Sequence, residues 1–190
     1  KNILYTLENS KLVKNMLKKI KKIKCISVIT NEKISEITNS GLLKSLNFGN
    51  SSKYNLIIIC TGNNSDLAQS LFRDQSITYS YGETSISTII DHDIIKNETA
   101  RQIFLDNAIF AMLPISKTKT SIVWSIKNSM KEKSNFFLKK KIKLYASNYL
   151  KSVKFASGLE KKDLNFLVRN KYYFERTLLF GDALHLMHPF

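Results

Sequence analysis

The residues best suited to bind a ligand lie at the end of the chain, where residues 176–190 read RTLLFGDALHLMHPF. The apolar run before Gly181 predicts a buried strand. Gly181 permits a tight turn and the close approach of a ligand. Asp182 would follow the end of that strand, where its carboxylate could accept hydrogen bonds from ligand hydroxyls. The alternative is that Asp182 only caps a helix, which is a common arrangement.

A second strand and turn of this kind occurs near residue 60. Residues 54–60 (YNLIIIC) form the most apolar run of the chain, which favours a parallel strand buried on both faces. The run leads into Thr61, Gly62, Asn63, Asn64 and Ser65. A strand, a turn and a helix capped by Ser65 would explain this pattern without any ligand.

The pattern R-x-x-L-x-G-D-A-x-H-x-x-x-P from Arg176 to Pro189 resembles the second flavin-binding motif of the FAD-dependent aromatic hydroxylases of the p-hydroxybenzoate hydroxylase type. Among these, the chain most resembles the hydroxylases of ubiquinone biosynthesis. The resemblance implies that FAD is the cofactor, that Asp182 holds its ribityl chain and that Pro189 lies near the flavin ring. Gly181, Ala183 and His185 would belong to the same cofactor site.

The turn after residue 60 departs from that family. The family has an Asp-Gly motif here, followed by Ser and Arg at intervals of three, and it is implicated in binding both FAD and NAD(P)H. This chain keeps Gly62 and Ser65 but has Thr61 and Ala68 in place of the Asp and the Arg. Thr61 and Gly62 are therefore expected to contact cofactor, and the loss of charge puts the reduction by NAD(P)H in question.

The middle of the chain predicts an antiparallel sheet. Apolar and polar residues alternate along residues 77–90, and further strands are expected at 100–105, 108–115 and 119–127. Residues 81–85, 110–115 and 121–125 resemble the ubiquinone hydroxylases in order and spacing. In that family this sheet covers the flavin, which makes Leu113, Pro114 and Trp124 the expected substrate-binding residues. Trp124 could equally be a core aromatic.

The remaining elements complete a mixed α/β fold. Strands are expected at 3–7, 25–30, 33–38 and 163–170, and a hairpin or loop at 41–53. Helices are expected from residue 9, at 65–73 and at 129–150. The apolar stripe of the first of these helices is expected to pack in the core. The helix at 129–150 is rich in lysine, and its apolar seam should pack inward or lie on a membrane surface.

These elements predict two domains. Residues 1–73 and 174–190 would form part of an FAD-binding layer with parallel strands, and residues 74–173 a mainly antiparallel substrate-binding sheet covered by helices. The chain is interpreted as an internal fragment of a longer protein. The family's Gly-x-Gly-x-x-Gly loop is absent from it, so this stretch is expected to bind FAD weakly or not at all by itself.

The composition limits the other functions. The net charge is +15, but only four of the 30 basic residues are arginine, so lysine-covered surfaces are favoured and no nucleic-acid partner is expected. Cys25 and Cys60 suggest buried, reduced thiols in a cytoplasmic protein, and no spanning segment is apparent. His92 is expected in a solvated strand end. His185 and His188 could share a helix face, but no third ligand is near, so no metal site is predicted.

The predicted function is therefore an FAD-dependent monooxygenase that hydroxylates a prenylated phenol in ubiquinone biosynthesis, with NAD(P)H and O2 as co-substrates. Contact with the inner membrane surface and assembly with other quinone-biosynthesis enzymes would suit that role. No catalytic side chain is assigned, because the cofactor supplies the difficult chemistry. Two alternatives stay open: a basic binding module for membrane or nucleic acid on the same scaffold, and a related flavoprotein acting on another aromatic substrate.

Overall fold

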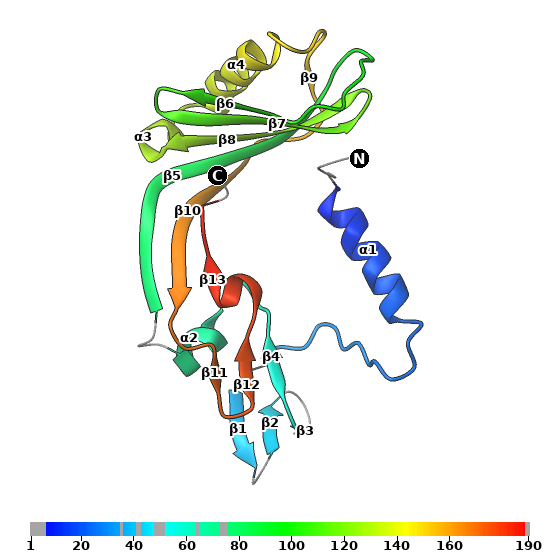
Figure 1. The fold of residues 1–190 in the computed structure, drawn as a ribbon, viewed down its shortest axis with the longest axis vertical. Helices are drawn as coiled ribbons and strands as arrows, with labels where there is room; N and C mark the ends of the chain where they lie inside the picture. Colours follow the sequence, from blue (N-terminus) through cyan, green and yellow to red (C-terminus); the bar gives the residue numbers. More distant parts are fainter. Residues whose placement is uncertain are drawn as a thin grey trace. The chain divides into compact units, whose positions relative to one another are not determined.

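The computed structural model describes residues 7–34, 36–40, 43–47, 52–63, 65–72 and 76–188. The chain forms two compact units (Figure 1): Lys1–Ile26 with Gly82–Leu164, and Ser27–Tyr81 with Asn165–Phe190. The fold is mixed α and β with mainly antiparallel strands, as predicted. The assignment of separate FAD-binding and substrate-binding domains stays a prediction.

A seven-stranded sheet has the strand order β13-β10-β5-β8-β7-β6, and β9 also pairs with β5. Its strands are β5 (Ser76–Asp91), β6 (Arg101–Leu105), β7 (Ala108–Ser116), β8 (Lys119–Lys127), β9 (Lys154–Phe155), β10 (Glu160–Arg169) and β13 (His185–Leu186). Buried and less buried residues alternate along the second half of β5, as its sequence predicts. The long strands expected from 77 to 127 are thus confirmed.

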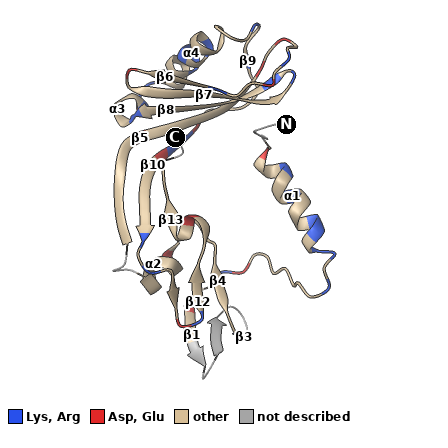
Figure 2. Ribbon diagram, in the orientation of Figure 1, with Lys and Arg blue, Asp and Glu red and all other residues tan. Residues whose placement is uncertain are grey.

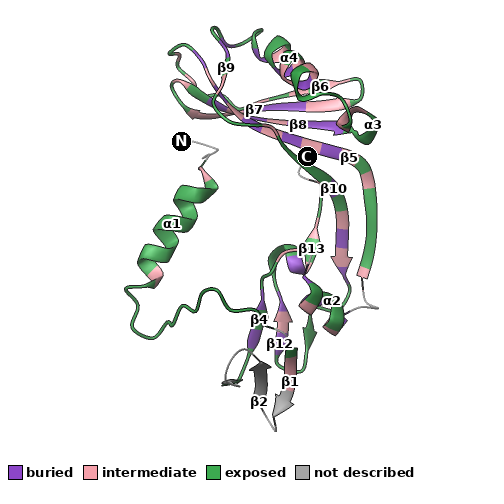
Figure 3. Cartoon of the chain, turned by 180° about the vertical axis from the view of Figure 1, so that it is seen from behind, coloured by how far each residue is buried: buried purple, intermediate pink, exposed green. Residues whose placement is uncertain are grey.

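The core of the first unit lies between this sheet and helix α4 (Asn135–Ala146), and Figure 3 shows buried residues along β5, β7 and β8. Leu138 and Ile142 of α4 are fully buried, so the inward-facing seam is confirmed. The predicted helix at 129–150 is two helices, α3 (Asn128–Lys131) and α4. They are separate because Ser134 caps α4, its hydroxyl accepting a hydrogen bond from the main-chain N–H of Phe137 at 3.2 Å.

Asp163 of β10 connects three elements of the first unit. Lys131 Nζ lies 2.7 Å from both carboxylate oxygens, and the hydroxyl of Thr84 on β5 donates to Oδ1 at 2.8 Å. Thr84 is completely buried, whereas the Asp163 side chain is 44% exposed. The hydrogen bonds from Lys131 and Thr84 lower the pKa of Asp163 below its ordinary value.

This lowered pKa predicts a loss of stability in acid. The folded carboxylate binds protons less readily than the unfolded one, so its stabilisation is present above the unfolded pKa and lost as the pH falls through the folded pKa. The Asp163→Asn variant should therefore lose less stability than the wild type between pH about 5 and pH about 3. Urea unfolding of both proteins at each pH measures this difference. Equal losses would contradict the prediction.

The second unit contains two three-stranded sheets. β1 (Glu36–Ser40), β2 (Leu43–Asn47) and β3 (Ser52–Tyr54) are antiparallel neighbours, which confirms the hairpin expected at 41–53. The other sheet has the order β11-β12-β4, with β4 (Ile57–Ile59), β11 (Tyr173–Phe174) and β12 (Thr177–Leu179). Helix α2 (Asp66–Phe72) packs against β4 and β12 through a core of Ile57, Ile59, Ala68, Phe72, Leu179 and Ala183.

Several local predictions are wrong. Residues 25–30 form no strand, since no strand of the described residues pairs with them, and the strand expected at 33–38 begins at Glu36. Ile58 is 54% exposed, so β4 is not buried on both faces; α2 covers one face only. Cys25 and Cys60 are exposed. The strand expected at 3–7 falls almost entirely outside the described residues.

His92 is buried instead of solvated. Nδ1 lies 2.8 Å from the main-chain oxygen of Asp93, and Nε2 lies 3.0 Å from the hydroxyl of Thr120. The residue is 6% exposed, so both ring nitrogens are satisfied inside the protein. His92 therefore fixes the end of β5 against β8. The sequence does not indicate this role, because the two aspartates beside His92 suggest an exposed position.

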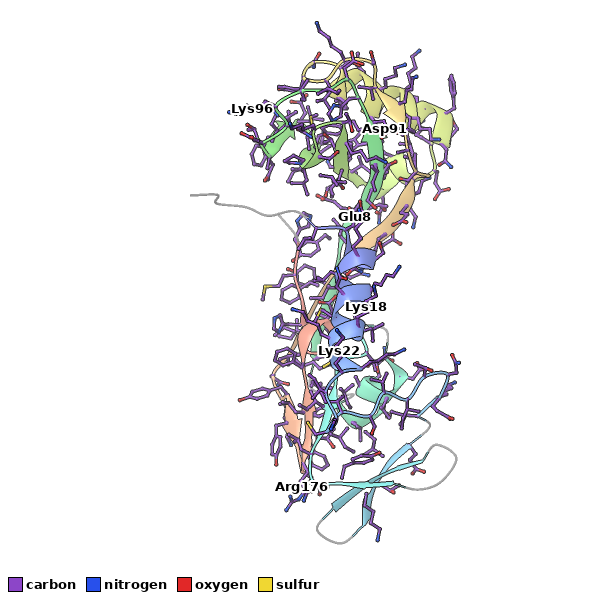
Figure 4. All side chains as sticks on the ribbon, turned by 90° about the vertical axis from the view of Figure 1, so that its right-hand side faces the viewer. Glu8, Lys18, Lys22, Asp91, Lys96 and Arg176 are labelled. Carbon is purple, nitrogen blue, oxygen red and sulfur yellow. The ribbon has the colours of Figure 1, made fainter. Side chains whose placement is uncertain are left out.

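Helix α1 (Asn9–Ile20) is the clearest departure from the predicted core. Its apolar stripe is exposed to between 41% and 52% at Leu12, Val13, Met16 and Leu17, and none of its residues is buried. Figure 4 labels Glu8 before the helix, Lys18 within it and Lys22 just after it. Within the part of the chain that the structure describes, no helix is long and apolar enough to cross a bilayer.

Candidate functional site

The two predicted motifs meet at one edge of the β11-β12-β4 sheet. β4 and β12 are parallel neighbours in which Ile59 is opposite Leu179. The main-chain N–H of Phe180 donates to the oxygen of Ile59 at 3.0 Å. Since β4 and β12 run in the same direction, Thr61 and Gly62 follow β4 at the same edge of the sheet at which Gly181 and Asp182 follow β12. This is the carboxyl end of parallel strands, where ligands bind in α/β sheets.

Both strands end in a turn that requires glycine. Gly62 has φ +80° and Gly181 has φ +64°, in the left-handed region that residues with a Cβ rarely adopt. A Cβ at either position would meet no atom within 4 Å, so both turns are open to their surroundings. The side chains of Thr61 and Asp182 are exposed there. A hydroxyl and a carboxylate are suitable partners for the hydroxyl groups of a ligand.

The turn carrying Asp182 is a short 3-10 helix, η1 (Gly181–Ala183), and not the start of an α-helix. Ala183 is fully buried and belongs to the core formed with β4, β12 and α2. This burial fixes the main chain of the turn while Asp182 stays exposed. A packed residue next to an exposed acceptor is suited to presenting that acceptor to a ligand.

Helix α2 starts next to Gly62 with a capped N-terminus. The hydroxyl of Ser65 accepts a hydrogen bond from the main-chain N–H of Ala68 at 3.1 Å, and Ser65 is only 7% exposed. The capping role expected for Ser65 is confirmed. The Ser65→Ala variant should lower the free energy of unfolding of the protein by about 0.5–2 kcal/mol.

Chemical denaturation tests this value, with Ser70→Ala as the matched control. Ser70 lies in the same helix but is exposed, and its hydroxyl donates to the carbonyl of Leu67 at 3.0 Å. The control should change stability by less than about 0.5 kcal/mol. An equal effect in both variants would show that the cap at Ser65 contributes nothing specific.

The two histidines of the motif do not share a helix. His185 lies in β13, where it pairs with Val168 of β10, because the chain turns back after Ala183 and joins the large sheet. The main-chain N–H of His188 donates to the hydroxyl of Tyr81 at 3.3 Å, and its ring packs edge-on against that of Tyr81. No metal-binding cluster occurs among the described residues. Pro189 lies outside the described residues.

A pocket of about 480 Å³ opens in the second unit, next to Asn63 and Leu186. Tyr79 of β5 and Phe166 of β10 line it, with stacked rings whose centroids are 4.5 Å apart. Gln69 of α2 and Arg169 of β10 line it as well. Sequence reasoning missed these residues, because alternation shows which residues share a face of a strand but not that β10 lies next to β5.

The three predicted substrate-binding residues do not lie together. Leu113 lines a pocket of about 380 Å³ in the first unit. Trp124 is 3% exposed and packs on the other face of the sheet, with ring centroids 6.3 Å from Phe110 and 5.9 Å from Tyr145. Pro114 is half-buried at a bulge of β7. Trp124 thus occupies the position of a core aromatic, and a substrate role for Leu113 and Pro114 stays a prediction.

The chain is similar in sequence to a ubiquinone hydroxylase. The chain is 23% identical to the ubiquinone hydroxylase UbiL of Rhodospirillum rubrum over 195 residues, which covers 97% of this chain and 44% of UbiL. The chain therefore spans less than half the length of this curated relative. No protein-family model matches the sequence.

Solved flavoproteins share the fold. The flavin-dependent halogenase CmlS superposes with a TM-score of 0.79 at 14% identity, over 96% of this chain and 36% of CmlS. Klebsiella pneumoniae HpxO, complexed with FAD and uric acid, superposes with a TM-score of 0.74 at 13% identity, over 96% of this chain and 49% of HpxO. The fold is that of the flavin-dependent hydroxylases and halogenases. A flavoprotein/dehydrogenase of Cytophaga hutchinsonii shares it too, with a TM-score of 0.77 at 13% identity over 98% of this chain and 49% of that protein.

Proposed function

We propose that the site at the ends of β4 and β12 binds FAD. The observation that carries this proposal is the pair of left-handed glycine turns, Gly62 and Gly181, at adjacent parallel strand ends, with an exposed Asp182 beside them. Asp182 would accept hydrogen bonds from the ribityl hydroxyls. The main chain at Thr61, Gly62, Gly181 and Ala183 would approach the cofactor, with His185 and Pro189 next to it.

The proposed reaction is hydroxylation of the aromatic ring of a prenylated phenol in ubiquinone biosynthesis. The similarity to UbiL supports this substrate, and HpxO, which has the same fold, is complexed with uric acid, a planar ring compound. The bound flavin would supply the activation of O2 after reduction by NAD(P)H. The role of this chain would be to bind and orient the cofactor and the substrate and to exclude water, so no acid or base from it is required. Enzymes of the same pathway are the proposed partners, in the cytoplasm or at the inner membrane.

An absorption spectrum tests this proposal. The complete gene product would be purified with added FAD, freed of excess and mixed with NADH or NADPH. Flavin bands that bleach support both the cofactor and the reductant. Bands without bleaching support FAD alone, with a nicotinamide step that is lost or that needs substrate or a partner. No bands would refute the flavin function.

A second function, attachment to an anionic membrane surface, is favoured by helix α1. Seven lysines and no acidic residue occur from Asn9 to Ile26, and Figure 2 shows basic residues along α1. The exposed stripe containing Leu12, Met16 and Leu17 provides an apolar face beside them. Such helices bind anionic lipid surfaces by combining apolar burial with charge attraction. Helix α4 is not suited to this role, because Leu138 and Ile142 are buried in the core.

Sedimentation with vesicles tests the membrane function. The protein should bind phosphatidylserine-containing vesicles, should not bind pure phosphatidylcholine vesicles, and should be released by salt. The Leu17→Glu variant should lose binding, whereas Leu144→Glu, at an exposed position of α4, should keep it. Equal binding by both variants would refute the role of α1.

A further inference from the structure

Arg169 at the end of β10 is a buried guanidinium whose hydrogen bonds reach two separate elements. The residue is 6% exposed. Nε donates to the carbonyl oxygen of Ala183 at 3.0 Å, and Nη1 donates to the carbonyl oxygen of Phe72 at 3.2 Å. Its main-chain N–H donates to the carbonyl oxygen of Leu184 at 3.1 Å. One side chain therefore joins the end of α2 to the end of the turn that carries Asp182.

Both acceptors are carbonyls that a helix leaves without a partner. Phe72 is the last residue of α2, and Ala183 is the last residue of η1. Carbonyls at such ends need donors from outside the helix, and cations are favoured there. Burial lowers the pKa of Arg169 from its ordinary value, yet an arginine stays protonated. Arg169 is in none of the ion pairs seen among the described residues. Its positive charge is therefore stabilised by the hydrogen bonds to these two carbonyl oxygens.

The two elements joined by Arg169 lead directly into the candidate site. Helix α2 is capped by Ser65, three residues after Gly62. The turn η1 contains Gly181 and Asp182 themselves. Phe72 and Ala183 also belong to the same buried cluster, so a shift of one element would disturb the other.

We propose that Arg169 is a positioning residue that couples α2 to the Gly181–Ala183 turn and so holds Gly62 and Asp182 in the arrangement that binds the cofactor. This inference rests on the proposed flavin site. The planar guanidinium presents several donors in a fixed fork, which lets it bond both carbonyls at once. Lysine keeps the charge but has a compact ammonium group, so it cannot reproduce that geometry.

The experiment compares Arg169→Lys with Arg101→Lys in the complete gene product. Arg101 is the matched control, because it lies in the other unit, donates to the carbonyl of Thr99 at 3.2 Å and is half-buried. Fluorescence titration gives the FAD affinity, and visible circular dichroism reports the surroundings of the bound flavin. Native-state hydrogen exchange reports the amides of α2 and of residues 181–184 without any cofactor.

We expect Arg169→Lys to weaken FAD binding by about 10-fold or more, to change the flavin dichroism and to speed exchange in both α2 and the turn. Arg101→Lys should leave all three unchanged. An Arg169→Lys protein with wild-type affinity, dichroism and exchange would overturn the inference. So would faster exchange spread evenly over the chain, since that indicates a general loss of stability.

Hydrogen exchange separates this inference from the flavin function. If the wild type binds no FAD, the flavin function fails, while faster exchange confined to α2 and the turn in Arg169→Lys still supports the coupling. If Arg169→Lys does not fold, exchange of the wild type in mild denaturant decides. Amides of α2 and of the turn that open together support the coupling, and amides that open independently overturn it.

Discussion

Replacing Phe110 with alanine is expected to lower the free energy of unfolding of the first unit by about 3–5 kcal/mol. Phe110 is completely buried on β7, between the sheet and α4. Its ring centroid lies 5.4 Å from that of Tyr145 and 6.3 Å from that of Trp124, in edge-to-face arrangements. Alanine would leave a cavity that β-sheet neighbours cannot fill, because strand pairing holds the main chain in place.

Phe104→Ala is the matched control for this prediction. Phe104 lies on the adjacent strand β6, opposite Ile109, but it is 74% exposed. Its removal should change stability by less than about 0.5 kcal/mol. The fluorescence of Trp124, the single tryptophan, follows unfolding of this unit directly in urea titrations. A small effect at Phe110 would mean that the aromatic cluster is loosely packed.

The antiparallel sheet could be predicted because its signals are local. Apolar and polar residues alternate along β5, which determines the residues that each face carries. The short turn between β7 and β8 fixes which residues of these two strands are opposite each other. The same pattern indicates that Ile122, Trp124 and Ile126 share a face. It does not indicate which face of the sheet is covered by α4. The sequence alone therefore could not tell that Trp124 belongs to the core while Leu113 lies on the opposite face. That distinction depends on packing between elements distant in sequence.

The candidate site was predictable for a different reason. Each half follows an apolar strand and contains a glycine, so each half is recognisable separately. The halves are brought together by the parallel pairing of β4 with β12. These two strands are far apart in the sequence, because strands β5 to β10 lie between them. Arg169 could not be recognised from sequence, because its partners are main-chain carbonyls, which any residue supplies.

Replacing Asp182 with alanine is expected to weaken FAD binding by about 10- to 100-fold, the effect of losing hydrogen bonds to a charged acceptor. The loss should fall on affinity and not on folding. Asp182 is exposed, whereas the packing of the turn comes from Ala183. Titration of the complete gene product with FAD measures the dissociation constant, and thermal unfolding without FAD measures stability.

Two further variants make this test specific. Asp182→Asn keeps the size of the side chain and an acceptor oxygen but removes the charge, so its affinity should lie between those of the wild type and Asp182→Ala. Asp106→Ala removes an exposed carboxylate from the turn between β6 and β7 in the other unit, and it should bind FAD as the wild type does. If all three variants bind FAD equally, the carboxylate at the end of β12 is not a cofactor ligand. The two glycine turns would then hold the flavin through the main chain alone.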